Sequence, residues 1–242
     1  ISVLRELVKI MPNENYLYFG DSMNAPYGTK EVSVIRELTI KNIEKLLDMG
    51  AKSIVVACNT ATSAAVRVLR QMYPKIPLVG IEPAIKPAVE YKEKSRVVVM
   101  ATPMTLKQEK FQNLMKKYEN QAEIVPLPCP GLMEFVERGD LEGEDLYNYL
   151  SILFGSVNSK KIDSVVLGCT HYPFAKKAIE AVVGKDVQIF DGGEGTAREM
   201  RRRMQCASLI NPSKEKGTVK FINSKDTEEE RELCEFLLNL KM

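Results

Sequence analysis

The chain has 242 residues, 45% of them hydrophobic and 27% charged, which is enough for one large domain or two modest ones. Its 34 lysines and arginines almost balance its 32 aspartates and glutamates, and a formal net charge of +2 argues against electrostatic capture of nucleic acid or a membrane. Five cysteines, a single histidine and no CxxC pair argue against a disulfide scaffold and against a zinc site. No apolar run is long enough to span a membrane, and the first residues lack the layout of a signal peptide. We therefore expect reduced thiols, no bound metal and a cytoplasmic location.

Hydrophobic spacing predicts helices and strands in alternation along the chain. Apolar residues three and four positions apart are typical of one face of a helix, whereas short continuous apolar runs are typical of a buried strand. The first elements expected are a helix over 1–10, a strand over 16–19, a loop over 20–30, a helix from 32 that stops at 50, a strand over 53–57, a helix from 61 that ends near 74, and a strand over 77–81. Next come a helix ending near 91, a strand over 96–101, a helix over 105–118, a strand over 123–126, helices over 132–136 and 145–157, a strand over 164–167, a helix over 174–183, a strand over 187–190 and a helix over 195–205. This alternation predicts an α/β fold of doubly wound parallel sheets with helices on both faces.

Two segments share one pattern around a cysteine. Residues 53–64 align without gaps on residues 164–175, and each places a cysteine, Cys58 or Cys169, after an apolar strand and just before a helix. Ligands of open α/β sheets bind beyond the carboxyl ends of the strands, so both cysteines are expected where chemistry takes place. The other three are expected to be packing residues, as most free cysteines are: Cys129, Cys206 and Cys234.

Two thiols on opposite sides of one small cavity have the geometry that a racemase needs. One base removes a proton from a stereocentre, and an acid on the other face returns a proton with inverted configuration. Cysteine suits both roles because its reference pKa of about 8.5 moves readily to either side of neutrality. The only histidine, His171, lies two residues after Cys169, where an imidazole can take or give the proton of the thiol.

The two cysteine segments, 55–62 and 167–173, closely resemble the two signature segments of the bacterial glutamate racemases, within the wider aspartate/glutamate racemase superfamily. The landmarks between and around them are similar as well, and the resemblance covers essentially the whole chain in order. These landmarks are Tyr18-Phe19-Gly20-Asp21, Pro26-Tyr27-Gly28-Thr29-Lys30, Cys129-Pro130, Val136-Glu137, Asp191 and Thr196-Ala197-Arg198-Glu199.

The resemblance implies an isomerase that interconverts L- and D-glutamate without a cofactor and supplies D-glutamate for peptidoglycan. It implies that Cys58 exchanges the proton on the D-glutamate side and Cys169 the proton on the L-glutamate side, with His171 and Glu137 assisting near Cys169. It also implies a set of substrate-binding residues: Tyr27, Gly28, Asn59, Thr60, Thr170 and His171. Hydroxyl, amide and backbone N–H groups suit two carboxylates and an ammonium.

The resemblance also implies two pseudo-symmetric α/β domains with the active site in the cleft between them. The first domain is expected to comprise residues 1–83 and the C-terminal helices within 195–242, and the second to comprise residues 84–194. The family begins with a strand and an Asp-Ser-Gly-rich turn just before the helix that starts here at Ile1, so a segment preceding Ile1 is expected to complete the first domain and the site. The expected partner is a small molecule, glutamate, without nucleic acid or membrane, and a homodimer stays open.

Three alternatives stay open on the sequence alone. An aspartate or hydantoin racemase would use the same two cysteines on another substrate. A pyridoxal phosphate racemase would need a Schiff-base lysine in a phosphate-binding setting, and nothing in the sequence marks one. A catalytically silent binding or regulatory protein could be built on the same fold.

Overall fold

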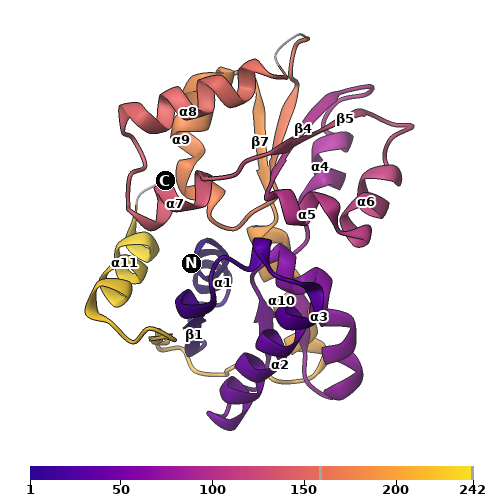
Figure 1. The fold of residues 1–242 in the computed structure, drawn as a ribbon. Helices are drawn as coiled ribbons and strands as arrows, with labels where there is room; N and C mark the ends of the chain where they lie inside the picture. The colour runs from indigo at the N-terminus through magenta and orange to yellow at the C-terminus, as the bar shows by residue number, and fades with distance from the viewer. Residues whose placement is uncertain (158–159, 241–242) are drawn as a thin grey trace. The chain divides into compact units, whose positions relative to one another are not determined.

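The computed structural model describes residues 1–157 and 160–240 (Figure 1). Within these residues the chain forms two compact units. Unit 1 contains Ile1–Glu82 and Gly193–Leu240, so it includes both the first and the last described residues, and unit 2 contains Pro83–Gly192. Each unit has its own sheets and its own core.

Unit 1 contains two pairs of parallel strands, β1 with β8 and β2 with β3. Its elements in chain order are α1 (Ser2–Ile10), β1 (Tyr16–Gly20), the 3-10 turns η1 (Ser22–Asn24) and η2 (Tyr27–Thr29), α2 (Val32–Asp48), β2 (Ile54–Val56), α3 (Asn59–Met72), β3 (Leu78–Gly80), α10 (Gly193–Cys206), β8 (Val219–Asn223) and α11 (Glu228–Asn239). Side chains of β2 and β3 alternate between two cores, since Ile54, Val56 and Leu78 join a cluster with residues of α2 and α3. Val79 joins the opposite cluster, with residues of α1 and α10.

Unit 2 contains one four-stranded parallel sheet in the order β5-β4-β6-β7. Its elements are α4 (Ile85–Glu90), β4 (Arg96–Ala101), α5 (Pro103–Lys107), α6 (Glu109–Lys116), β5 (Glu123–Pro128), α7 (Leu132–Glu137), α8 (Glu144–Gly155), β6 (Ser164–Leu167), the 3-10 turn η3 (Tyr172–Ala175), α9 (Lys176–Val183) and β7 (Gln188–Asp191). In Figure 1, α8 and α9 lie on one side of this sheet and α4, α5 and α6 on the other.

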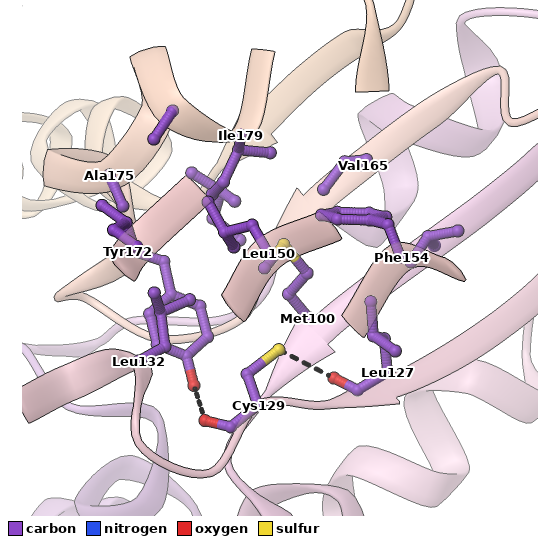
Figure 2. Close-up of a cluster of buried hydrophobic side chains, with 14 of the residues drawn as sticks. Met100, Leu127, Cys129, Leu132, Leu150, Phe154, Val165, Tyr172, Ala175 and Ile179 are labelled. Atoms are coloured by element: carbon purple, nitrogen blue, oxygen red, sulfur yellow. Dashed lines mark hydrogen bonds between the residues drawn. The ribbon is translucent and has the colours of Figure 1, made fainter. Parts of the chain in front are cut away.

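The central strands of unit 2 are buried on both faces, as parallel strands in a doubly wound sheet are. All six residues of β4 and all four of β6 are buried. Val98 and Val165 belong to the cluster that includes residues of α8 and α9, which Figure 2 shows, whereas Val97 and Val166 belong to the cluster on the opposite face. The predicted α/β fold with parallel sheets covered by helices is confirmed.

Two predictions about single elements are wrong. The expected helix over 105–118 is broken at Gln108, whose extended backbone (ψ 134°) separates α5 from α6. Leu106 and Phe111 both join the same core cluster, and residues five positions apart lie on different faces of a continuous helix, so the break lets both side chains point inward. The C-terminal part of the chain was expected to be helical, but it contains the strand β8, which lies beside β1.

No helix among residues 1–157 and 160–240 is long and apolar enough to cross a membrane.

Candidate active site

Cys169 lies at the carboxyl edge of the sheet of unit 2. The strand β6 ends at Leu167, and the backbone N–H of the next residue, Gly168, donates to the carbonyl oxygen of Met100 at 2.7 Å. A Cβ atom at position 168 would lie 2.7 Å from that same carbonyl oxygen, so only glycine lets the chain pass this close to β4. Gly168 therefore fixes where Cys169 leaves the sheet.

Cys169, His171 and Glu137 form a continuous chain of polar contacts. The Sγ atom of Cys169 lies 3.7 Å from Nδ1 of His171, and Nε2 of His171 lies 2.6 Å from Oε1 of Glu137. Glu137 is the last residue of α7, and α7 packs against the turn η3 that follows His171. The structure thus brings together three of the predicted catalytic residues, and Thr170 lies between Cys169 and His171 in the chain.

The contacts of His171 favour its charged form. Burial lowers the pKa of this imidazole, but hydrogen bonds to Cys169 and Glu137, together with the negative charges of both groups, outweigh burial and raise the pKa to about 9. An imidazolium flanked by a sulfur and a carboxylate can return a proton to a thiolate or stabilise it as an ion pair.

Cys58 lies at the start of a helix in unit 1. It is the N-cap residue of α3, with an extended backbone (φ −139°, ψ 123°), and its carbonyl oxygen accepts from the backbone N–H of Thr62 at 2.8 Å. Asn59 and Thr60, the first two helical residues, are buried. Thr62 anchors this helical turn further, because its hydroxyl donates to the carbonyl oxygen of Val56 at 3.1 Å. The backbone N–H groups and the positive dipole end of a helix N-terminus favour a nearby negative charge.

Gly80 lets α3 approach the sheet of unit 1. A Cβ atom at this position, in β3, would lie 2.5 Å from Cγ2 of Thr62 and 2.8 Å from Cγ2 of Val66. The backbone N–H of Thr62 donates to Cys58 and its hydroxyl donates to Val56, so the Thr62 side chain has little room to move away from such a Cβ atom. The glycine therefore belongs to the local structure that positions Cys58.

Tyr27 and Gly28 form part of the turn η2, which packs against α3. The Tyr27 hydroxyl donates to Oδ2 of Asp21 at 2.6 Å, and the side-chain amide of Asn42, from α2, donates to both groups at 3.0 Å and 3.1 Å. Burial raises the pKa of Tyr27, and the hydrogen bond to Asp21 and the charges of Asp21 and Cys58 raise it further. Tyr27 therefore stays protonated and donates to Asp21.

Asp21 is an organising residue whose role the sequence pattern did not predict. Partial burial acts to raise the pKa of its carboxyl group, but hydrogen bonds from Tyr27, Asn42, Asn24 and Ser224 outweigh burial and lower the pKa below its ordinary value. The one feature of the sequence that could have identified Asp21 is its position, directly after the carboxyl end of the strand β1. Its partner Asn42 carries no such signal, because it is one polar residue of a long surface helix.

The other three cysteines differ from one another in their surroundings. Cys129 is buried in the core cluster of unit 2 that includes residues of α8 and α9. Its thiol donates to the carbonyl oxygen of Leu127, and its own carbonyl oxygen accepts from the Tyr172 hydroxyl (Figure 2). Burial raises the pKa of the Cys129 thiol, and the charge of Cys169 raises it further, so this thiol stays protonated. Cys234 is buried on α11, whereas Cys206 is exposed at the end of α10. The prediction that Cys206 packs in a core is wrong, because it lies on the solvent side of the last turn of its helix.

The predicted site residues divide between the two units. Unit 1 holds Cys58, Asn59, Thr60, Tyr27 and Gly28. Unit 2 holds Cys169, Thr170, His171 and Glu137. Within the described part of the chain, no group of three or more histidine, cysteine, aspartate or glutamate side chains could hold a metal ion.

Known proteins resemble this chain over nearly its whole length. The family model of the Asp/Glu/hydantoin racemases matches residues 3–200. The glutamate racemase of Clostridium novyi (strain NT) is 52% identical over 230 residues, which are 95% of this chain and 89% of that protein.

Two solved structures share the fold. The glutamate racemase of Francisella tularensis subsp. tularensis SCHU S4, in complex with D-glutamate, has a TM-score of 0.85 at 26% identity and covers 100% of this chain and 90% of its own. The Escherichia coli glutamate racemase, in complex with L-glutamate and the activator UDP-MurNAc-Ala, has a TM-score of 0.83 at 26% identity, over 98% of this chain and 89% of its own. In sequence and in fold, therefore, the chain belongs to the Asp/Glu/hydantoin racemase family of isomerases.

Proposed function

We propose that this racemase interconverts L- and D-glutamate with two cysteines and no cofactor. The observation that carries the proposal is that each unit places a cysteine two residues after the end of a parallel strand and before a helical segment. Cys58 follows β2 and directly precedes α3, and Cys169 follows β6 and lies three residues before the first residue of η3. The choice of glutamate is supported by the name of the relative at 52% identity and by the D- and L-glutamate bound in the two similar structures.

The proposed reaction removes the α-proton from one face of the glutamate α-carbon and adds a proton to the opposite face. In the D-to-L direction the Cys58 thiolate takes the α-proton of D-glutamate, which leaves the bonding electron pair on a planar carbanion. The Cys169 thiol then gives its proton to the opposite face, which yields L-glutamate and a Cys169 thiolate. The reverse direction exchanges these roles.

His171 and Glu137 serve the second thiol in this proposal. The contact of 3.7 Å between Cys169 Sγ and His171 Nδ1 is within reach for a hydrogen bond to sulfur, and Glu137 holds the other ring nitrogen at 2.6 Å. His171 can therefore move the proton of Cys169, while Glu137 orients the ring and favours its charged form.

The substrate is held, in this proposal, by small polar groups rather than by lysine or arginine. Asn59 and Thr60 present an amide and a hydroxyl at the N-terminus of α3, and Tyr27 and Gly28 present backbone N–H groups. Thr170 and His171 supply the corresponding groups of unit 2. Unit 1 and unit 2 each supply one of the two cysteines. The product D-glutamate would serve peptidoglycan synthesis in the cytoplasm.

Proton exchange with solvent tests the proposal directly. The full-length protein, incubated with either enantiomer in deuterated water, is expected to incorporate deuterium at the α-carbon and to produce the other enantiomer. Cys58→Ser and Cys169→Ser are each expected to abolish racemisation, because a hydroxyl is far less acidic than a thiol.

Each other outcome has a defined meaning. Substantial turnover in either serine variant would refute the two-thiol scheme. Turnover of aspartate or a hydantoin in place of glutamate would reassign the substrate within the family, and glutamate binding without any exchange would identify a silent binding protein.

A further inference from the structure

One carboxylate of the C-terminal helix is largely covered although its neighbours are exposed. Glu230 belongs to the acidic first turn of α11, in which Glu228 and Glu229 are exposed, but its own side chain is only 14% exposed. Its Oε2 atom accepts from the Ser22 hydroxyl at 2.9 Å and from the side-chain amide of Asn223 at 3.1 Å. Hydrogen bonds to an ionised, partly buried carboxylate are stronger than those between neutral groups, so Glu230 fixes the groups that donate to it.

These donors join the C-terminal segment to the loop that follows β1. Asn223 is the last residue of β8 and lies opposite Gly20, the last residue of β1. Besides Glu230, its side-chain amide donates to the Ser22 hydroxyl oxygen at 2.8 Å. A Cβ atom at Gly20 would lie 3.1 Å from that amide nitrogen, so the two chains are in close contact here.

Ser224 adds a second set of bonds to the same loop. Its backbone N–H donates to the carbonyl oxygen of Gly20 at 2.9 Å, and its hydroxyl oxygen accepts from the backbone N–H of Met23 at 2.9 Å. Its side chain also bonds to the carboxylate of Asp21 and helps to lower the pKa of that group. Residues 20–23 are thus fixed on both sides of Asp21.

Asp21 connects this fixed loop to the turn η2 through hydrogen bonds. Its carboxylate accepts from the Tyr27 hydroxyl at 2.6 Å and from the side-chain amide of Asn24 at 2.9 Å. A 3-10 turn of three residues has few hydrogen bonds of its own, so its position depends on such side-chain contacts. Glu230 is therefore connected to Tyr27 by its hydrogen bond to Ser22, the peptide bond between Ser22 and Asp21, and the hydrogen bond from Tyr27 to Asp21.

We propose that Glu230 is a positioning residue for substrate binding: through Ser22 and Asn223 it fixes the loop whose Asp21 holds Tyr27 and Gly28 in place. The inference rests on the proposed function, in which Tyr27 and Gly28 bind the substrate. Glu230 contacts no reacting atom, so its loss is expected to weaken the binding of substrate and transition state alike. That pattern raises KM and leaves kcat nearly unchanged.

The test compares two glutamates of the same helix. Glu230→Ala is expected to raise KM for both enantiomers about tenfold, the effect of about 1.4 kcal/mol of binding free energy, with kcat changed less than about threefold. Glu230→Gln keeps a side-chain oxygen that accepts from Ser22 and is expected to restore most of the affinity. Glu232→Ala removes the same charge from an exposed site on α11 and is expected to behave as the wild type.

Amide hydrogen exchange provides a readout that does not depend on turnover. In Glu230→Ala, amides of residues 22–28 are expected to exchange faster, while those of β4 and β6 stay as slow as in the wild type. Faster exchange confined to this loop together with the rise in KM would support the proposal. An unchanged KM, or a rise matched by Glu232→Ala, would overturn it, as would a uniform increase in exchange across unit 1, which indicates general destabilisation.

The failure of the proposed function would look different. A wild-type protein that neither racemises nor binds glutamate would refute the proposed function, and the exchange of residues 22–28 would still show whether Glu230 holds the loop. A wild-type protein that racemises glutamate, with a Glu230→Ala variant of unchanged KM, would refute only the positioning role.

Discussion

The two cysteine segments begin alike and then diverge. In unit 1 the helix α3 begins at Asn59, directly after Cys58, so the thiol lies at the N-terminus of a helix of 14 residues. In unit 2 a 3-10 turn, Tyr172–Ala175, separates Cys169 from the helix α9, which begins only at Lys176. The residue two positions after the cysteine is Thr60 in unit 1 and His171 in unit 2.

This difference indicates two ways to assist a thiol in one fold. At Cys58 the sequence supplies oriented backbone N–H groups, which favour negative charge without titrating. At Cys169 a 3-10 turn stands where α3 has its first helical residues, and the imidazole of His171 lies 3.7 Å from the sulfur and 2.6 Å from the carboxylate of Glu137. The first arrangement is a fixed electrostatic environment, and the second is an acid–base pair that can gain and lose a proton.

The largest effect expected from this asymmetry is that of removing the imidazole. His171→Asn keeps a polar side chain but cannot act as an acid or base near neutral pH, so kcat is expected to fall by about 10²- to 10⁴-fold. Steady-state rates in both directions, measured over a range of pH, would check the prediction. A variant with kcat within threefold of the wild type would show that the contact with Cys169 has no catalytic role.

The matched change in unit 1 is Thr60→Ala. Thr60 occupies the position of His171 but has no titratable group, so its loss is expected to raise KM by about tenfold, as the loss of one hydrogen bond to a charged substrate does, with a smaller effect on kcat. If Thr60→Ala lowered kcat as far as His171→Asn does, the residues beside Cys58 and Cys169 would not differ in acid–base function.

The sequence alone predicted the parts of the site that depend on local pattern. An apolar strand followed by a cysteine, small polar residues and a helical segment identified both Cys58 and Cys169, because strand, turn and helix are adjacent in the chain. The partners of His171 and Tyr27 depend on tertiary structure instead. Glu137 was found only by resemblance to a family, and Asn42 was missed, because a polar residue on a helix has no pattern that says what it faces.

The fold was predictable to a similar extent. Strands β4 and β6 are apolar on both faces, so their limits were predicted exactly as the structure has them, 96–101 and 164–167. The strand β8 was missed because it lies at the edge of a sheet, contains Lys220, and forms only by pairing with β1 from the other end of the chain. Such pairing leaves little signal in the local sequence.

A steric change before the second cysteine is expected to have the next largest effect. In Gly168→Ala the new Cβ atom would lie 2.7 Å from the carbonyl oxygen of Met100, and because that atom belongs to the backbone of β4, Cys169 must move. A shift of about 1 Å at a catalytic group can cost up to about 10²-fold in kcat/KM. Activity and the thermal unfolding midpoint, measured together, would separate displacement of the thiol from loss of the folded state.

The equivalent position in unit 1 provides the control. Ala57 precedes Cys58 and already carries a Cβ atom, so Ala57→Gly removes a contact instead of forcing one. We expect a modest loss of stability, about 1 kcal/mol or less, from the added freedom of the unfolded chain, and little loss of kcat/KM. Equal losses of activity in Gly168→Ala and Ala57→Gly would contradict the steric explanation.

The smallest expected effect is the titration of His171, which NMR can follow without overlap because the chain contains a single histidine. In the wild type the imidazole is expected to titrate near pH 9 instead of its ordinary 6.5. Glu137→Gln removes one of the two negative partners and is expected to lower the pKa of His171 part of the way towards its ordinary value. Glu134 is an exposed residue of the same helix, and Glu134→Gln is expected to leave the pKa of His171 close to 9.

The raised pKa of His171 also determines how the free energy of unfolding changes with pH. Because the folded-state pKa lies above that of the unfolded chain, protonated His171 stabilises the fold fully below about pH 6.5, and this contribution is lost as the pH rises through about 9. Denaturant unfolding at pH 6 and pH 9.5 should therefore show a smaller pH-dependent loss of stability in Glu137→Gln than in the wild type. An equal loss in both proteins would mean that Glu137 does not hold the proton on His171, and the acid–base assistance assigned to Cys169 would then depend on the contact with the sulfur alone.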